Sequence, residues 1–148
     1  MKTFKKPLVY SCSGCSDVAQ LANGLALYLN QSGQAEMSCI SGVGGRVPAL
    51  VRLARSGRKL IAIDGCALQC ARSCLAQIHL EPDLHVRLYE EGYKKHHHQL
   101  YDEETLQQAS SKLLQQVINL QEESCITTDI TDQSATNDPG HGFITQKF

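Results

Sequence analysis

The chain has 148 residues, with 14 Lys and Arg against 15 Asp and Glu, so its formal charge at pH 7 is −1. This length predicts a single domain with a hydrophobic core and is too short for two. The nearly neutral charge gives no attraction for nucleic acid or an anionic membrane, and the absence of Trp argues against a base-stacking surface. We therefore expect neither nucleic acid nor a membrane as a partner. The composition does not identify the partner, and it is compatible with a homo-oligomer.

The 7 cysteines are a high number for a chain of this length. A secretory signal would explain them through disulfide bonds, but the apolar run after the basic first residues contains only Leu8, Val9 and Tyr10. No other apolar run approaches the length that spans a membrane. We expect a cytoplasmic protein, in which closely spaced thiols favour metal binding or redox chemistry over structural disulfides.

Hydrophobic periodicity predicts strands that alternate with helices along the chain. The predicted strands are residues 8–10, 36–41, 59–63 and 84–88. The predicted helices begin at Asp17, at Pro48, just after Gly65 and at Asp102. Alternating strands and helices are typical of a parallel sheet covered by helices. We predict one α/β domain over residues 1–123, a three-layer sandwich whose mostly parallel sheet has about four strands in a Rossmann or flavodoxin-like arrangement.

Local signals predict where several of these elements begin and end. Asp17 is expected to cap the first helix together with Gln20. The Gly-Val-Gly-Gly run at residues 42–45 predicts a tight loop, which could alternatively cradle a phosphate or a carboxylate. The helix after Gly65 is expected to bury Leu68 on its apolar face. Residues 124–148 are rich in Thr, Asp, Ser and Gly with little apolar content, which predicts a disordered tail.

Cysteines follow the predicted strands at the points where the strands end. Cys12 and Cys15 follow the first strand, Cys39 ends the second, and Cys66 and Cys70 follow the third. The carboxyl ends of parallel strands lie on one edge of a sheet, and neighbouring strands are roughly 5 Å apart. If the first and third strands are neighbours, as in a flavodoxin-like order, their thiols face each other at that edge.

The spacing of these thiols suits a metal ion. Cys12 and Cys15 form a C-x-x-C pair, and Cys66 and Cys70 are separated by about one helical turn, so they share a face. Together the pairs offer thiolates to a tetrahedral ion, for which zinc is the commonest occupant. The competing interpretation is that they are small core residues. Cys39 stays open as a ligand in place of Cys15, as a reactive thiol or as a packed residue.

The polar residues near this edge give no pair of groups for acid–base catalysis, so catalytic residues stay unknown and an enzymatic activity stays open. Asp64 is expected to cap the helix that follows it, with a role as a base as the alternative. His85 is expected to face solvent from an edge strand.

The remaining histidines and cysteines carry weaker signals. His96, His97 and His98 could bind a metal, but with Lys94 and Lys95 beside them they predict an exposed loop. Cys74 continues the row of Cys66 and Cys70 by one turn and is expected in the core, and Cys125 is expected to be incidental.

The tripeptide Asp64-Gly65-Cys66, followed by Cys70, resembles the signature of the DGC-domain family. The similarity extends to the Cys-Ser-Gly run at residues 12–14, to Cys39 with its following glycines, and less closely to residues 92–95. It covers about residues 7–100. The resemblance implies a bacterial or archaeal zinc-binding protein with no established activity.

The resemblance also implies a ligand set. By matching position, Cys12, Cys66 and Cys70 are the implied zinc ligands, and Cys39 rivals Cys15 as the fourth. The spacing of the cysteines favours Cys15, whereas the family pattern makes Cys39 its competitor.

The leading hypothesis is therefore a single α/β domain that holds one zinc ion at the carboxyl edge of its sheet. The ion would be structural in a closed cysteine shell and catalytic in an open one. The main rival is a thiol redox or sulfur-transfer enzyme with Cys12 or Cys66 as the reactive thiolate. Two further hypotheses are an iron–sulfur protein and a non-enzymatic adaptor that uses the apolar face of the last helix.

Overall fold

The computed structural model describes the backbone of residues 5–132 and the side chains of residues 5–123. In chain order the elements are β1 (Leu8–Ser11), α1 (Asp17–Gln31), β2 (Glu36–Met37), α2 (Ile40–Gly44), α3 (Pro48–Ala54), β3 (Leu60–Asp64), α4 (Cys70–Ala76), β4 (Leu84–Arg87) and α5 (Glu103–Asp132). The 4 strands pair in the order β2-β1-β3-β4, and every pairing is parallel. This confirms the predicted α/β fold and its flavodoxin-like strand order.

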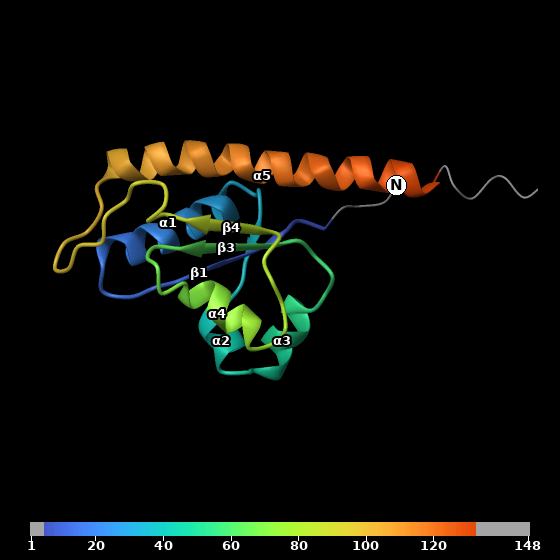
Figure 1. Cartoon of the computed structure of the whole chain (residues 1–148), viewed down its shortest axis with the longest axis horizontal. Helices are drawn as coiled ribbons and strands as arrows, with labels where there is room; N and C mark the ends of the chain where they lie inside the picture. The colour runs from blue at the N-terminus through green and yellow to red at the C-terminus, as the bar shows by residue number, and fades with distance from the viewer. Residues whose placement is uncertain (1–4, 133–148) are drawn as a thin grey trace, which may run out of the picture.

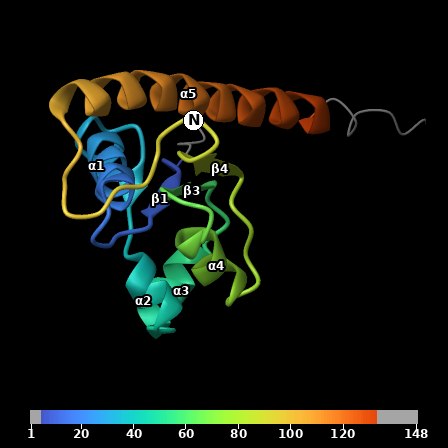
Figure 2. The same cartoon turned by 60° about the vertical axis from the view of Figure 1, so that its left-hand side comes forward.

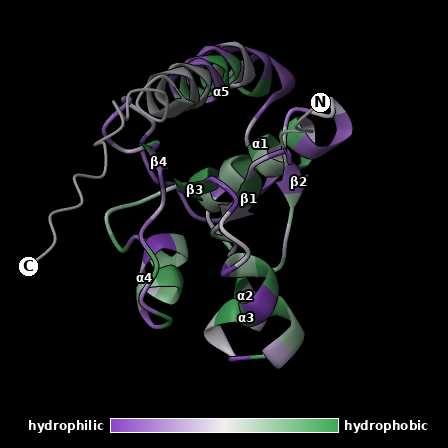
Figure 3. Cartoon of the chain, turned by 90° about the vertical axis from the view of Figure 1, so that its right-hand side faces the viewer, coloured by the Kyte–Doolittle hydropathy of each residue, from purple (hydrophilic) through white to green (hydrophobic). Residues whose placement is uncertain are grey.

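The sheet is the middle of three layers. Helices α1 and α5 cover one face, and α2, α3 and α4 cover the other (Figures 1 and 2). Alternate residues of β3 serve the two faces: Ile61 and Ile63 pack with α1 and α5, whereas Leu60 and Ala62 pack with α2, α3 and α4. The central strands β1 and β3 carry hydrophobic colouring in Figure 3, while the short edge strand β2 combines the exposed Glu36 with Met37, which packs against the core. Such double-sided burial is what a parallel sheet requires.

The segment after β2 differs from the sequence-based expectation. The strand predicted for residues 36–41 ends at Met37, and the predicted tight loop at residues 42–45 lies largely within helix α2, Ile40–Gly44. A side chain at Gly42 would collide with Leu50 of α3, so glycine at this position allows the two short helices to pack closely. The glycines that suggested a loop therefore serve helix packing.

Helix α4 begins later than predicted. It starts at Cys70, and the preceding residue, Gln69, has a left-handed backbone with φ of 51°. Leu68, which was expected in the buried face of this helix, lies in the loop before it and is 70% exposed. The helix starts at Cys70 because the carboxylate of Asp64 accepts hydrogen bonds from the N–H groups of its first residues, Ala71 and Arg72.

Two further helix boundaries differ from those predicted from the sequence. The cap of α1 is Ser16, whose Oγ accepts a hydrogen bond from the N–H of Ala19 at 3.3 Å, rather than Asp17. Helix α5 continues to Asp132, past Ser124, where the predicted tail begins, and residues 133–148 of that tail lie outside the described residues. Among the helices that the structure describes, none combines the length and hydrophobicity needed to span a bilayer.

Two leucines of α1 that differ in burial provide a test of the described core. Leu25→Ala should lower the free energy of unfolding by about 2–5 kcal/mol, because Leu25 is fully buried between the sheet and α5. Leu27→Ala is the matched control, since Leu27 is 42% exposed on the same helix, and its effect should stay below about 1 kcal/mol. Urea unfolding of both variants measures the difference. Equal losses would contradict the burial described for α1.

Candidate functional site

The loops after β1 and β3 meet at the carboxyl edge of the sheet. The N–H of Cys12 donates to the carbonyl of Ile63 at 3.0 Å, and the Sγ of Cys12 accepts a hydrogen bond from the N–H of Gly65 at 3.2 Å. Cys12 is 7% exposed, so this contact is enclosed. In Figure 1 the arrowheads of β3 and β4 point to this edge, at the left of the view. The two cysteine-bearing loops are therefore joined directly.

Gly65 lies where the loop after β3 packs closely against α1. A Cβ at Gly65 would lie 2.5 Å from the carbonyl oxygen of Val18 in the first turn of α1. Real Cβ atoms do not approach a backbone oxygen so closely, so only glycine fits between Cys12 and α1 without a backbone shift.

The pKa of the Cys12 thiol responds to its burial and to the charged groups around it, which include Cys66 and Cys70. Burial raises the pKa of Cys12 to about 11, a hydrogen bond from Gly65 opposes this, and the negative charges of Asp64, Cys70 and Cys66 raise the pKa further. Desolvation and neighbouring negative charge both disfavour a thiolate. The raised pKa of Cys12 thus comes first from its burial, and the Asp64–Cys70 segment adds to it.

Asp64 organises the start of α4. It is fully buried, its Oδ1 accepts from the N–H of Ala71 at 2.8 Å, and its Oδ2 accepts from the N–H of Arg72 at 3.1 Å. The expected capping role of Asp64 is confirmed. The same Oδ2 also lies 2.9 Å from the Nε2 of His85, so every oxygen of this buried carboxylate has a partner.

The prediction that His85 faces solvent is wrong. Its side chain is only 16% exposed, and it points to the α4 face of the sheet because His85 lies opposite Ala62 in the register of β3 and β4. Sequence reasoning missed this contact. The alternation of side chains along β4 could have revealed it. In a parallel pairing of β3 with β4, that alternation places His85 on the same face of the sheet as Asp64.

Residues 94–98, which we call the basic loop, lie over the thiols at this edge. The Nζ of Lys95 is 3.9 Å from the Sγ of Cys66, and the Nδ1 of His97 is 3.9 Å from the Sγ of Cys15. The loop is exposed, as predicted for the histidine run. Its proximity to two cysteines was not predicted.

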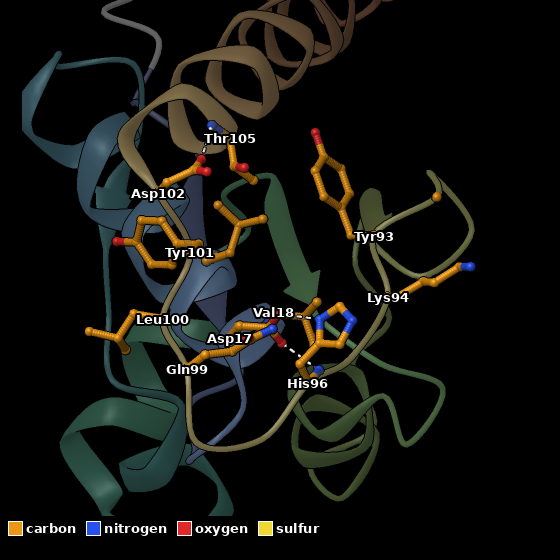
Figure 4. Close-up of a pocket in the computed structure, with 12 residues that line it drawn as sticks. Asp17, Val18, Tyr93, Lys94, His96, Gln99, Leu100, Tyr101, Asp102 and Thr105 are labelled. Atoms are coloured by element: carbon orange, nitrogen blue, oxygen red, sulfur yellow. Dashed lines mark hydrogen bonds and ion pairs between the residues drawn. The ribbon is translucent and has the colours of Figure 1, made fainter.

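Asp17 at the start of α1 fixes this loop. Its Oδ1 accepts from the backbone N–H of His96 and its Oδ2 lies against the Nδ1 of the same residue, both at 2.7 Å (Figure 4). Burial would raise the pKa of Asp17, but the hydrogen bonds from His96 outweigh it and lower the pKa. An antiparallel bridge between Ser16 and His97 adds to the attachment.

A pocket of about 400 Å³ lies between this attachment, the start of α1 and the start of α5. Val18 and Leu21 belong to its lining, together with Tyr93 and Tyr101, which stand on opposite sides in Figure 4. Asp17 therefore forms part of this pocket as well as anchoring the basic loop.

Cys39 and Cys74 have different surroundings. Cys39 is exposed at the N-cap of α2, where hydrogen bonds from Ser41 and from the N–H of Gly42 lower its pKa. Cys74 is half-buried where α4 meets α2, with its Sγ beside Gly44, and burial raises its pKa. The structure thus places Cys39 at the N-cap of α2 and Cys74 between two helices. Cys125 lies outside the residues whose side chains are described.

The donor atoms at this edge match zinc in their chemistry. The 6 cysteines with described side chains, 12, 15, 39, 66, 70 and 74, are free thiols, and thiolate and imidazole are the ligands that zinc prefers. Within residues 5–123, however, no three Cys, His, Asp or Glu side chains converge as they stand on one ion position. Cys15, Cys39, Cys66 and Cys70 are exposed or half-exposed, so rotamer changes can move their sulfurs without repacking the core.

The family model for the DGC domain matches residues 8–113, which include every element from β1 to the first part of α5. The chain belongs to the DGC domain family. It is similar to the anaerobic and virulence modulator AnvM of Pseudomonas aeruginosa, with 63% identity over 89 residues, which are 60% of this chain and 68% of AnvM. No solved structure matches the chain.

The junction at Gly65 generates a stability prediction. Gly65→Ala should destabilise the fold by about 1–3 kcal/mol, because its Cβ would displace α1 or the loop after β3. Gly14→Ala is the matched control, since a Cβ there would lie 3.8 Å from the Cβ of Ala19, an ordinary contact. Thermal and urea unfolding compare the variants. Equal stability of Gly65→Ala and Gly14→Ala would show that the junction tolerates a side chain.

The attachment of the basic loop can be tested separately. Asp17→Ala should speed amide hydrogen exchange at His96 and His97 by about tenfold or more, because the acceptor of the His96 N–H is removed. Glu103→Ala, which also removes a carboxylate from the first turn of a helix, should leave this exchange unchanged. If Asp17→Ala exchanged at the wild-type rate, the described attachment would be wrong.

Proposed function

We propose that this DGC protein is a cytoplasmic zinc-binding protein that holds its ion at the carboxyl edge of the sheet. Cys12, Cys66 and Cys70 supply the sulfur ligands, and Cys15 or Cys39 supplies the fourth. A closed cysteine shell of this kind makes the ion a structural tie between the loops after β1 and β3.

The observation that carries this proposal is the hydrogen bond from Gly65 to the Sγ of Cys12. It joins the first cysteine loop to the segment that contains Cys66 and Cys70. Hydrogen bonds of this kind orient metal ligands and tune the charge on a bound thiolate. Cys12 is 7% exposed, so a metal bound to its thiol would be shielded from solvent on that side.

The biological role follows from the relative. AnvM is described as an anaerobic and virulence modulator, and we propose that this chain also acts as a modulator. Exposed thiols are sensitive to oxidants, so a zinc–cysteine site would remain intact in an oxygen-poor, reducing cytoplasm. Zinc binding would then maintain the arrangement of loops that a partner recognises.

Metal content tests the proposal. Protein purified with a reductant should contain about one equivalent of zinc, and Cys66→Ser should lower zinc affinity by about tenfold or more, because a ligand is lost. Cys74→Ser is the matched control, since Cys74 lies between α4 and α2, and it should retain zinc. Elemental analysis and chelator competition give both values. Metal-free protein in which every cysteine titrates as a free thiol would disprove zinc binding.

A thiol redox or sulfur-transfer activity is the second candidate, and a specific contact favours it. The Nζ of Lys95 lies 3.9 Å from the Sγ of Cys66, and reactive cysteines typically lie in partly exposed positions beside a basic side chain. Cys12, in contrast, is buried and has a raised pKa, which suits a free nucleophile poorly. Metal-free protein with one fast-reacting thiol at Cys66 would favour this candidate over zinc binding.

A further inference from the structure

The basic loop presents alternate side chains to two different parts of the site. Lys95 and His97 each approach a cysteine sulfur at 3.9 Å, whereas His96 between them turns toward Asp17. Side chains two positions apart on an extended segment share a face, so this pattern is what a strand-like loop produces. The loop thus has a thiol-facing side and an anchored side.

The anchored side determines where the thiol-facing side lies. Asp17 accepts from both the backbone and the ring of His96, and its own N–H donates to the carbonyl of His96 at 3.1 Å. With the Ser16–His97 bridge, this holds the loop against the first turn of α1. Because Cys15 directly precedes Ser16, the N-cap residue that bridges to His97, the side chain of His97 is held near Cys15.

A zinc ion bound by cysteine thiolates needs such donors. Four thiolates on a divalent ion leave a charge of about −2, which nearby N–H donors and cations offset. Hydrogen bonds to a charged sulfur are stronger and shorter than those to a neutral thiol, so donors that lie beside a thiolate ligand stabilise it.

We propose that the basic loop is an outer shell of hydrogen-bond donors for the zinc–thiolate site, in which Lys95 supports Cys66 and His97 supports Cys15. This inference rests on the zinc-binding function proposed above. It also assigns the fourth ligand, because the loop covers Cys15 and not Cys39.

Geometry supports that assignment. Lys95 and His97 are two positions apart, so their Cα atoms are separated by at most about 7 Å, and the thiols they approach lie under one short segment. Cys39 instead lies at the start of α2, after the edge strand β2, where its Sγ is 3.2 Å from the Oγ of Ser41. Cys15 is thus the candidate that shares an outer shell with Cys66.

The chain provides matched controls for the loop. Lys95→Ala and His97→Ala should each weaken zinc binding by about 10- to 100-fold, as the loss of outer-shell partners does. Lys94→Ala and His98→Ala remove the same residue types one position away and should stay within about threefold of the wild type. Lys94 extends away from the Asp17–His96 pair in Figure 4. Competition with a chromophoric chelator under reducing conditions measures all four.

A second measurement tests the ligand. In cobalt-substituted protein, Cys15→Ser should remove about a quarter of the sulfur-to-cobalt charge-transfer absorbance, whereas Cys39→Ser should leave it unchanged. His97→Ala should cost no further affinity in the Cys15→Ser background, since its partner sulfur is already absent.

The outcomes separate this inference from the proposed function. Zinc-loaded protein whose Lys95→Ala and His97→Ala variants bind as tightly as their controls would overturn the outer shell and leave zinc binding intact. Loss of the cobalt band in Cys39→Ser instead of Cys15→Ser would overturn the assignment of Cys15. A wild-type protein that binds no zinc would refute the proposed function, and the inference with it.

Discussion

The parallel pairing of β1 with β3 is the constraint on which the rest of the site depends. It places Ser11 beside Ile63, so the chain leaves both strands at the same level and the loops that follow begin side by side. The N–H of Gly65 then bonds to the Sγ of Cys12, and the absence of a side chain at Gly65 lets α1 pack against the same point. One strand pairing and one glycine thus bring together a thiol, a loop and a helix start that are distant in sequence.

The buried carboxylate of Asp64 shows how the fold holds the segment between Gly65 and Cys70 in place. An unpaired buried charge would be costly, but Asp64 is matched by the N–H groups of Ala71 and Arg72 and by His85. Gln69 adopts a left-handed backbone just before α4, a conformation that persists only where surrounding contacts enforce it. Gln69 is held by its own contacts, since its N–H donates to the carbonyl of Cys66 at 3.1 Å and its Nε2 donates to the hydroxyl of Tyr89 at 2.8 Å. Asp64 fixes the start of α4 that follows.

The sequence predicted the features that local patterns determine. The apolar run at residues 59–63 and the turn signals around it were sufficient to predict β3 and its place in a parallel sheet. Helix α2 was missed because its Gly-rich residues favour turns when they are considered without the tertiary contacts of the helix. The contact between His97 and Cys15 was beyond prediction, since it joins residues 82 positions apart through a loop that Asp17 positions.

The cysteines of this edge are chemically unequal, and their differences follow from burial. Burial raises the pKa of Cys12, and the neighbouring negative charges of Asp64, Cys70 and Cys66 add to the rise. Cys15 and Cys66 lie at the surface, where the nitrogens of His97 and Lys95 approach them. If the proposed zinc ion binds here, it would displace the proton of the enclosed thiol, and the nitrogens beside Cys15 and Cys66 would stabilise the charge of the zinc–thiolate group.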